Sequence, residues 1–423
     1  MPAAHTMFMD ELMLKADLAR QASYSLSQVS NPVRQRAIES MANALMGHAK
    51  EIIDANSSDV EEYKRKFPSS PLLDRLALNE SRLRDASESL MKVSALPDPI
   101  GEVVEGWKTD SGLQIKKVRV PLGVIGAIYE SRPNVTIDIA GLAVKSGNAV
   151  ILRGGSEAVR SNVAIGKVLQ DSLNGIIDKN AVQVIEDPDR SIVDRMIRLR
   201  GAIDIIVPRG SSSFINYIVG NSTVPVIETG AGNNHIFVNS DADLEMATKI
   251  IVNAKVQRPA VCNAVRKVLI HKNIAEEYLP KIVGEMRKYG VRVKGDEFSI
   301  KIDPTIEPAS SEDWDTEYLD LTLAIKVVNS VQEAVGHINA HGTKHSEAII
   351  TSNISDAEYF TNNVDAACTY VNASIRFTDG EQFGFGAEVG ISTQKLHARG
   401  PMGIRELTTT KYIIYGNGQV REI

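Results

Sequence analysis

The strongest constraint on the fold is a regular alternation of short apolar runs with helical stretches between Val124 and Ile227. Each run is continuous in hydrophobic residues instead of alternating with polar ones, which is typical of strands buried on both faces. Buried strands separated by helices predict a parallel, doubly wound α/β sheet with right-handed connections. The runs are Val124–Ile128, Ala149–Leu152, Val182–Ile185, Ile203–Val207 and Val226–Ile227.

A second α/β unit is predicted to begin near His235. Its strand candidates are Ile236–Val238, Arg266–Ile270, Ala324–Val328, Ala348–Thr351 and Thr369–Val371.

The remaining segments are predicted to be helices and half-exposed strands. Residues 10–67 and 71–96 have helical patterns, and Ser30-Asn31-Pro32 interrupts the first with a helix-start signal. Leu113–Val120 and Thr408–Tyr415 alternate between apolar and polar residues, which indicates strands with one exposed face.

The charge balance excludes some partners. The 423 residues include 47 Lys and Arg against 53 Asp and Glu, a formal charge of −6, so the basic excess of a nucleic-acid binder is missing. A stretch without acidic or basic residues, Gly210–Ile227, is too polar for a membrane. The two cysteines, Cys262 and Cys368, cannot form a disulfide framework. We therefore expect a cytoplasmic enzyme acting on a small molecule, without nucleic-acid or membrane partners.

Two turns have features of phosphate-binding sites. Arg153-Gly154-Gly155-Ser156 and Arg209-Gly210-Ser211 each follow a predicted strand and precede a helix. Open α/β sheets bind ligands at this edge, and helix N-termini favour anions. Ordinary turn and capping chemistry explains either turn alone, but two such turns on one sheet favour a nucleotide.

Candidates for other chemistry remain open from the residues alone. Cys262 lies on a predicted loop near Arg258, where a nucleophilic thiolate is favoured, whereas Cys368 fits a small buried residue. Glu228, after a predicted strand, is either a general base or a solvated turn residue. The histidines His337, His341 and His345 recur every four residues, but Gly342 is expected to end their helix, so no metal site is predicted.

Several segments together resemble the gamma-glutamyl phosphate reductase family, a branch of the aldehyde dehydrogenase superfamily. The match runs in order through nearly the whole chain, and its most specific part lies between Phe383 and Gly403. The matching segments are Val120–Gly126, Glu130–Thr136, Gly147–Gly155, Gln257–Asn263, Tyr370–Ser374 and Phe383–Gly403.

The resemblance implies an α/β, aldehyde dehydrogenase-like fold with two doubly wound α/β domains and a small β oligomerisation element. Residues 1–104 and 121–229 would form the cofactor-binding domain, and residues 230–392 the catalytic domain. Residues 105–120 and 393–423 would form the oligomerisation element, whose strands would pair across the subunits of a homo-oligomer.

The implied activity is the NADPH-dependent reduction of L-glutamyl 5-phosphate to L-glutamate 5-semialdehyde and phosphate, in proline biosynthesis. Cys262 would form a thioester, and the Asn134 amide with the Cys262 backbone N–H would stabilise the oxyanion. Glutamate 5-kinase is an expected partner.

The resemblance also implies an NADP(H) site. Its expected residues are Arg153, Gly154, Ser156, Gly210, Ser211, Glu228 and Glu317. NADP is expected over NAD because NAD-preferring relatives have a glutamate where this chain has the uncharged Ser156, with Arg153 nearby as a possible phosphate partner. Glu228 matches the residue that activates water in hydrolytic relatives, a role that would waste this substrate. We therefore expect it to be turned away, or its water to be excluded.

Four basic residues are expected to hold the anionic groups of the substrate: Arg132, Arg258, Lys395 and Arg399. Surface salt bridges are the competing interpretation for Arg132 and Arg399. Two other functions compete with the reductase: a dehydrogenase that oxidises free aldehydes with water, and a catalytically silent relative.

Overall fold

The computed structural model describes residues 10–70 and 72–421. The chain divides into two compact units. Unit 1 contains the described residues up to Glu228, together with Gly384–Gly390 and the residues from Met402 onward. Unit 2 contains Thr229–Phe383 and Ile391–Pro401. Residues 393–401, which we expected in the oligomerisation element, therefore group with unit 2.

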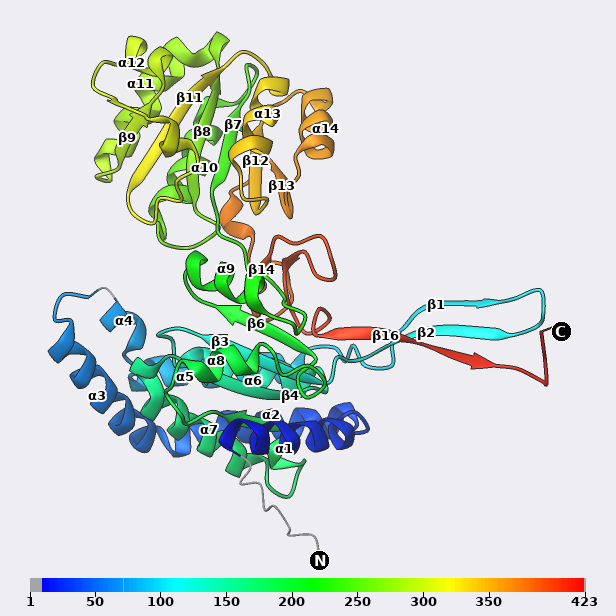
Figure 1. The fold of residues 1–423 in the computed structure, drawn as a ribbon. Coiled ribbons are helices and arrows are strands. Elements are labelled where there is room, and N and C mark those ends of the chain that lie inside the picture. Colours follow the sequence, from blue (N-terminus) through cyan, green and yellow to red (C-terminus); the bar gives the residue numbers. More distant parts are fainter. Residues whose placement is uncertain (1–9, 71, 422–423) are drawn as a thin grey trace, which may run out of the picture. The chain divides into compact units, whose positions relative to one another are not determined.

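Unit 1 contains a four-stranded parallel sheet of order β5-β4-β3-β6 (Figure 1). Its strands are β3 (Val124–Tyr129), β4 (Ala149–Gly154), β5 (Val182–Val184) and β6 (Ile205–Arg209). Its longer helices are α1 (Glu11–Leu26), α2 (Asn31–Gly47), α3 (Ala49–Lys66), α5 (Glu80–Ala95), α6 (Asn134–Lys145), α7 (Val159–Leu173) and α9 (Ser212–Asn221). Short helices are α4 (Leu72–Leu76) and α8 (Ser191–Met196).

The boundaries of the N-terminal helices follow local capping chemistry. The side chain of Asp10 accepts from the Met13 N–H at the start of α1, and Pro32 lies in the first turn of α2. The helix predicted over 10–67 also breaks at His48, between α2 and α3. The expected strand at Val226–Ile227 is reduced to a single bridge between Ile206 and Val226.

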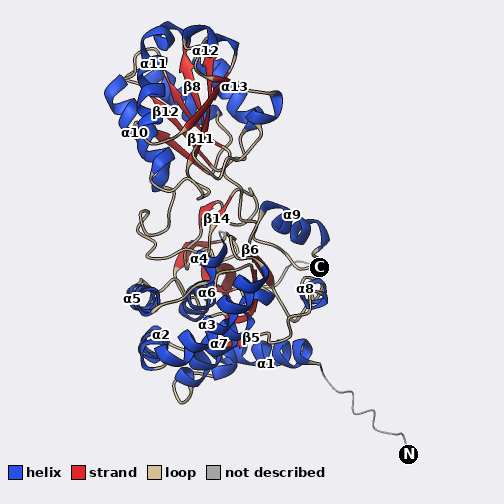
Figure 2. Ribbon diagram, turned by 90° about the vertical axis from the view of Figure 1, so that its left-hand side faces the viewer, coloured by secondary structure: helices blue, strands red, loops and turns tan. Residues whose placement is uncertain are grey.

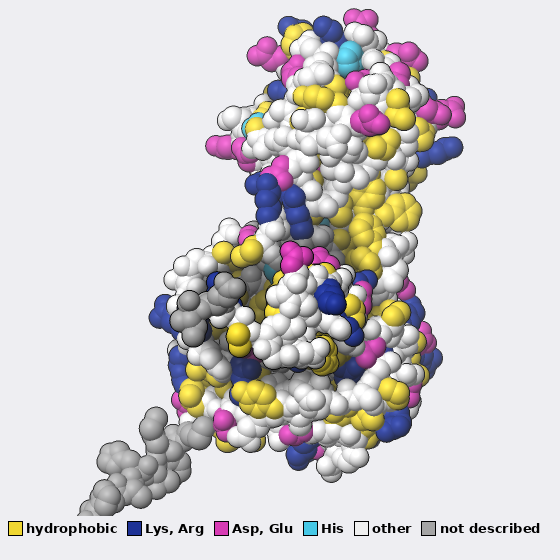
Figure 3. All heavy atoms as spheres, turned by 90° about the vertical axis from the view of Figure 1, so that its right-hand side faces the viewer, with side chains coloured by type: hydrophobic (Ala, Val, Ile, Leu, Met, Phe, Trp, Pro, Cys, Tyr) yellow, Lys and Arg dark blue, Asp and Glu magenta, His cyan; other side chains and the backbone are white. Residues whose placement is uncertain are grey.

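A three-stranded antiparallel sheet forms a long ribbon in unit 1. It contains β1 (Val103–Lys108), β2 (Gln114–Pro121) and β16 (Thr408–Tyr415), in the order β1-β2-β16 (Figure 1, cyan and red). The C-terminal strand pairs with β2 of the same chain along its whole length. Hydrophobic side chains such as Trp107 and Ile414 are exposed on it, and Figure 3, which faces the ribbon, shows hydrophobic, acidic and basic groups together on the surface.

Unit 2 contains a seven-stranded sheet of order β10-β9-β11-β8-β7-β12-β13, with parallel pairing throughout. Its helices flank the strands on both sides (Figure 2). The strands are β7 (Asn234–Val238), β8 (Val265–His271), β9 (Arg292–Gly295), β10 (Glu307–Pro308), β11 (Thr322–Val328), β12 (Ser346–Ile350) and β13 (Cys368–Val371). The helices are α10 (Leu244–Val256), α11 (Lys272–Lys288), α12 (Glu297–Ile302), α13 (Val331–His341) and α14 (Ile354–Asn363). A separate pair, β14 (Ile391–Ser392) and β15 (Gly400–Pro401), is antiparallel.

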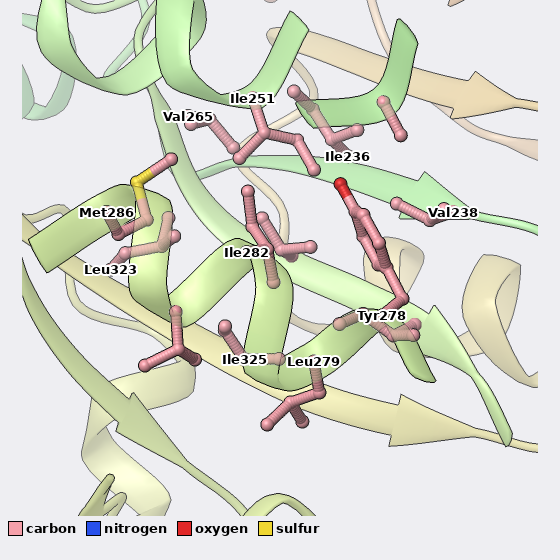
Figure 4. Close-up of a cluster of buried hydrophobic side chains, with 14 of the residues drawn as sticks. Ile236, Val238, Ile251, Val265, Tyr278, Leu279, Ile282, Met286, Leu323 and Ile325 are labelled. Carbon is pink, nitrogen blue, oxygen red and sulfur yellow. The ribbon is translucent and has the colours of Figure 1, made fainter. Parts of the chain in front are cut away.

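The central strands of unit 2, β7, β8 and β12, are buried along their whole length. On β7, Ile236 and Val238 pack in one core with α10 and α11, while Phe237 packs in a second core with α13 and α14. Figure 4 shows Tyr278 and Ile282 of α11 directed at the strands of the first core. These two cores hold β7 and β8 in place, and the loop before β8 carries Cys262.

Within the described residues, every helix is too short or too polar to cross a bilayer.

Candidate active site

Cys262 lies on the loop that joins α10 to β8 in unit 2, and its side chain is partly buried. The Asn234 amide nitrogen donates to the carbonyl oxygens of Cys262 (2.7 Å) and Ala264 (2.9 Å). A Cβ atom at Gly232 would overlap the Cys262 carbonyl, so only glycine allows the two backbones this close an approach. Residues at the start of β7 therefore fix the backbone that carries the thiol.

Two further side chains fix the same loop. The Arg266 guanidinium donates to the Val261 carbonyl at 2.8 Å, and the Asn263 amide donates to the Thr378 carbonyl at 2.8 Å. Arg266 is fully buried, as is Asn234. A loop held this way loses little freedom when it reacts, which is what a positioned nucleophile requires.

The electrostatic surroundings of Cys262 are cationic. Burial lowers the pKa of Arg266 to about 10, against the opposing effects of Glu317 and Cys262. Burial also lowers the pKa of Arg376, and Arg258 lowers it further, while Cys262 raises it. Neighbouring guanidinium groups favour a thiolate over a thiol. Of these three arginines the sequence pointed only to Arg258, although Arg266 was the first residue of a predicted strand, Arg266–Ile270.

Glu317 lies beside this loop within unit 2. Its carboxylate accepts from the Gly232 N–H at 2.7 Å and lies 3.9 Å from the Arg266 guanidinium. Glu317 therefore contacts Gly232 and Arg266, the two residues that also contact the Cys262 loop.

Lys255, at the end of α10, is fully buried, and burial lowers its pKa to about 7.

Lys395 and Arg399 share a partner in unit 2. Both pair with the Asp365 carboxylate, at 2.9 Å and 2.7 Å, and Lys344 pairs with it at 3.3 Å. The cations strongly lower the pKa of Asp365. Three cations on one carboxylate leave a net positive surface, which fits an anion-binding role as well as a salt-bridge network.

Cys368, at the start of β13, has a different environment from Cys262. Burial raises its pKa, which disfavours the thiolate. Neither Cys262 nor Cys368 forms a disulfide in the structure.

Asn134 is the first residue of α6 in unit 1 and is exposed. Its amide nitrogen donates to the Asp138 carboxylate at 3.3 Å, one turn along the helix. Burial raises the pKa of Asp138 to about 6, against the opposing effects of Asn134 and Arg209.

Arg132 is exposed on the loop before α6, where Ser131 has a φ of 38° and its backbone N–H donates to Glu157. A strained residue held beside Asn134 is consistent with a functional turn.

Arg153, at the end of β4, is buried, and burial lowers its pKa. Its guanidinium donates to the carbonyls of Gly154 (2.9 Å), Pro188 (2.8 Å) and Asp189 (3.2 Å). Most of its donors are therefore engaged with the backbone. A Cβ at Gly154 would overlap Asn162, so this glycine is required by close packing, while Ser156 is exposed at the same edge.

Gly210 and Ser211 form the turn between β6 and α9 and are exposed. The Ser211 N–H donates to the Glu130 carboxylate at 2.7 Å, and a Cβ at Gly210 would overlap that carboxylate. The turn thus forms a cradle that already holds one anionic group, which fits a cofactor pyrophosphate. Glu130 was not among the predicted site residues.

Glu228 is half-buried and is the last residue of the first segment of unit 1.

The three histidines that recur every four residues do not share one helix. Helix α13 ends at His341 and is capped by Gly342, as predicted, so His345 lies beyond it. In the described part of the chain no group of three or more His, Cys, Asp or Glu side chains is arranged to hold a metal ion.

The two parallel α/β sheets are those expected of an aldehyde dehydrogenase-like fold. In agreement, the sequence model of the Aldehyde dehydrogenase family matches residues 6–318.

More specific similarities come from individual relatives. A gamma-glutamyl phosphate reductase of Caldanaerobacter subterraneus subsp. tengcongensis is 54% identical over 413 residues, covering 97% of this chain and 100% of the relative. One of Clostridium tetani is 54% identical over 421 residues, covering 97% and 98%. The crystal structure of gamma-glutamyl phosphate reductase from Thermotoga maritima has a TM-score of 0.96 at 50% identity and covers 98% of this chain and 100% of that one.

The chain belongs to the gamma-glutamyl phosphate reductases, within the aldehyde dehydrogenase family. The family resemblance, the fold class and the class of enzyme predicted from the sequence are thereby confirmed. As a reductase of this family, the chain uses a nicotinamide cofactor. The roles of individual residues and the domain functions stay predictions.

Proposed function

We propose that the chain reduces L-glutamyl 5-phosphate to L-glutamate 5-semialdehyde and phosphate, with NADPH as the reductant, as a step of proline biosynthesis. The observation that carries this proposal is the fixed, cation-flanked loop of Cys262 in a chain about half identical to reductases of that name. Such a loop suits a thiolate that must repeatedly attack and leave the same carbon atom.

Cys262 acts as the nucleophile. Its thiolate attacks the acyl carbon of the substrate, and the C–O bond to phosphate breaks with its electron pair, leaving a thioester on Sγ. When bound, the nicotinamide supplies a hydride to the thioester carbon. The resulting oxyanion re-forms the carbonyl as the C–S bond breaks, which releases the aldehyde and restores the thiolate.

Asn134 is assigned to the oxyanion by the family resemblance, together with the backbone N–H of Cys262. The Asn134 amide is held by Asp138, one turn along α6. This hydrogen bond limits the rotation of the amide, so Asp138 is a positioning residue for Asn134.

The cofactor is proposed to be NADP(H). Gly210 and Ser211 would receive its pyrophosphate, and Ser156, with Arg153 and Gly154, would form the end of the site that meets the adenosine ribose. Glu317 would bind the nicotinamide ribose. Since Ser156 is uncharged and exposed, it places no repulsion against a 2′-phosphate. Both terminal nitrogens of the Arg153 guanidinium donate to backbone carbonyls, so we assign Arg153 to holding the loop at Pro188 and not to bidentate binding of a phosphate.

The anionic groups of the substrate are proposed to meet Arg132, Arg258, Lys395 and Arg399. Buried anions require partners, and the substrate carries both a phosphoryl group and an α-carboxylate. Asp365 would hold Lys395 and Arg399 in place before the substrate arrives.

The main alternative is hydrolytic oxidation of a free aldehyde, in which Glu228 would activate water. In the proposed function, Glu228 is assigned to the cofactor site and takes part in no essential proton transfer. Replacement Glu228→Gln is then expected to leave the reductive rate within about tenfold of wild type, under ~1.4 kcal/mol of barrier. A far larger loss, with NADPH binding intact, would favour the hydrolytic role.

One assay separates the reductase from both alternatives. The semialdehyde is supplied with NADP⁺, and NADPH formation is followed with and without inorganic phosphate. A reductase working in reverse requires phosphate, a hydrolytic enzyme does not, and a silent relative gives no signal. Cys262→Ala should abolish the reaction and Cys368→Ala should retain most of it.

We further propose a cytoplasmic homo-oligomer. The supporting observation is the ribbon of β1, β2 and β16, whose edge strands β1 and β16 carry exposed hydrophobic residues such as Trp107 and Tyr412. Such edges are commonly covered by another copy of the chain. Glutamate 5-kinase, which would supply the unstable acyl phosphate, is the proposed partner in the cell.

A further inference from the structure

The carboxylate of Glu130 occupies the turn to which the pyrophosphate of the cofactor is assigned. Glu130 follows β3 directly, and its backbone N–H donates to the Arg209 carbonyl at 3.0 Å, which places it beside the end of β6. From there its side chain reaches the Ser211 N–H at 2.7 Å. The half-buried carboxylate also lies against the Cα of Gly210, in the space a Cβ would fill.

The N-terminus of α9 otherwise lacks an anionic partner of its own. Ser211 is the N-cap residue, but its side chain makes no capping hydrogen bond, and the first turn of α9 contains no acidic residue. A helix start of this kind favours a negative group, because its free N–H groups and dipole are unsatisfied. Glu130 supplies that negative group from another strand.

A phosphate and the Glu130 carboxylate cannot use this turn together. Both are anionic, both need the same N–H donor, and the space over Gly210 holds only one of them. We propose that Glu130 is an internal competitor for the cofactor: it occupies the turn in the free enzyme, is displaced when the pyrophosphate binds, and returns as the cofactor leaves. This inference rests on the proposed function, because it assumes the pyrophosphate at Gly210 and Ser211.

The competitor would lower cofactor affinity and quicken cofactor release. Binding of the pyrophosphate would break the charge-assisted hydrogen bond between the Ser211 N–H and Glu130. As the pyrophosphate leaves, Glu130 would form that hydrogen bond again. An enzyme that must exchange NADP⁺ for NADPH in every cycle benefits from that faster release. Glu80 provides a comparison for net charge, because its exposed carboxylate at the start of α5 accepts from Arg84 at 2.9 Å and has no assigned role in cofactor binding.

The test is a binding measurement on the intact chain. Dissociation constants of NADPH, ADP-ribose and adenosine 2′-monophosphate are measured calorimetrically for wild type, Glu130→Gln and Glu80→Gln, with thermal melts to confirm folding. Glu130→Gln should bind NADPH and ADP-ribose about three- to tenfold more tightly, because a neutral amide competes less well than a charged acceptor. Adenosine 2′-monophosphate, which lacks the pyrophosphate, should bind unchanged, and Glu80→Gln should behave as wild type.

Each other outcome overturns the inference. Weaker or unchanged NADPH binding in Glu130→Gln would make Glu130 a support of the bound cofactor or a simple helix cap. Equal tightening by Glu80→Gln, or for adenosine 2′-monophosphate, would trace the effect to net charge. If wild type bound none of the three ligands, the proposed function itself would fail. That result differs from wild-type binding with no change in the variant, which refutes only the role of Glu130.

Discussion

The Asn234 side-chain amide donates to the Cys262 carbonyl oxygen at 2.7 Å, so the first residue of β7 holds the backbone of the proposed nucleophile. Its second proton goes to Ala264 at 2.9 Å, and its own oxygen accepts from the Ser346 N–H at 3.3 Å. The loop that carries Cys262 is thereby held to the buried sheet of unit 2.

Replacement Asn234→Ala should lower both stability and the reactivity of Cys262. Two carbonyls lose their donor, which costs about 1–3 kcal/mol of unfolding free energy for a buried group, and the loop gains freedom. Urea unfolding and the rate of Cys262 alkylation by iodoacetamide measure the two effects. The control is Asn239→Ala, since Asn239 is equally buried in unit 2 but bonds Asp241 and Asp356. It should lose stability and keep Cys262 reactivity; equal loss of reactivity in both variants would contradict the role of Asn234.

Asp138 should make unit 1 less stable as pH rises. Its folded-state pKa of about 6 lies above the ordinary value of 3.8, so its protonated form is favoured by folding. Its contribution to stability is complete below pH 3.8 and is lost as pH rises through 6. The full shift corresponds to about 3 kcal/mol. Asp138→Asn should therefore gain stability over wild type by up to that amount between pH 4 and pH 7, measured by urea unfolding at both. A difference that does not change with pH would show that the carboxyl is not perturbed.

Ser156 should decide the preference for NADPH over NADH. Replacement Ser156→Glu puts a negative charge at the proposed 2′-phosphate end of the site, so kcat/KM for NADPH should fall more than tenfold relative to that for NADH. Ser156→Ala removes the hydroxyl without adding charge and should keep the wild-type preference. Steady-state kinetics with both cofactors measure the ratio, and an unchanged ratio in Ser156→Glu would place the 2′-phosphate elsewhere.

Lys395 and Arg399 should contribute to substrate binding beyond their pairing with Asp365. Single replacements by Ala should raise KM for phosphate and for the semialdehyde severalfold in the reverse assay. Lys344→Ala is the matched control, because Lys344 pairs with the same carboxylate at 3.3 Å and has no assigned substrate role. If all three variants kept the wild-type KM, the cluster would be a surface salt-bridge network.

The sequence predicted the elements that are defined by local pattern, and missed those that depend on distant partners. The strands β3 and β4 were predictable because burial on both faces produces continuous apolar runs. The short strand β9 was not, since its four residues, Arg292–Gly295, include two charged side chains and a glycine.

In the site, Cys262 and Asn134 were expected because they match a family pattern. The long-range contacts of Asn234 and Glu130 were not. Asn234 lies 28 residues from Cys262, and Glu130 lies 81 residues from Ser211, and nothing in the local sequence marks either pairing. The residues of each pair meet because they lie on or next to strands that are neighbours in a sheet, β7 with β8 and β3 with β6.

The central claim, a thioester on Cys262 that phosphate resolves, is tested most directly by trapping that intermediate. The enzyme is mixed with the semialdehyde and NADP⁺ without phosphate, quenched in acid, and digested for peptide mass spectrometry. The account predicts a glutamyl adduct on the Cys262 peptide, none on the Cys368 peptide, and loss of the adduct when phosphate is added before the quench. An adduct on Cys368, or phosphate-dependent turnover with no adduct on Cys262, would contradict it.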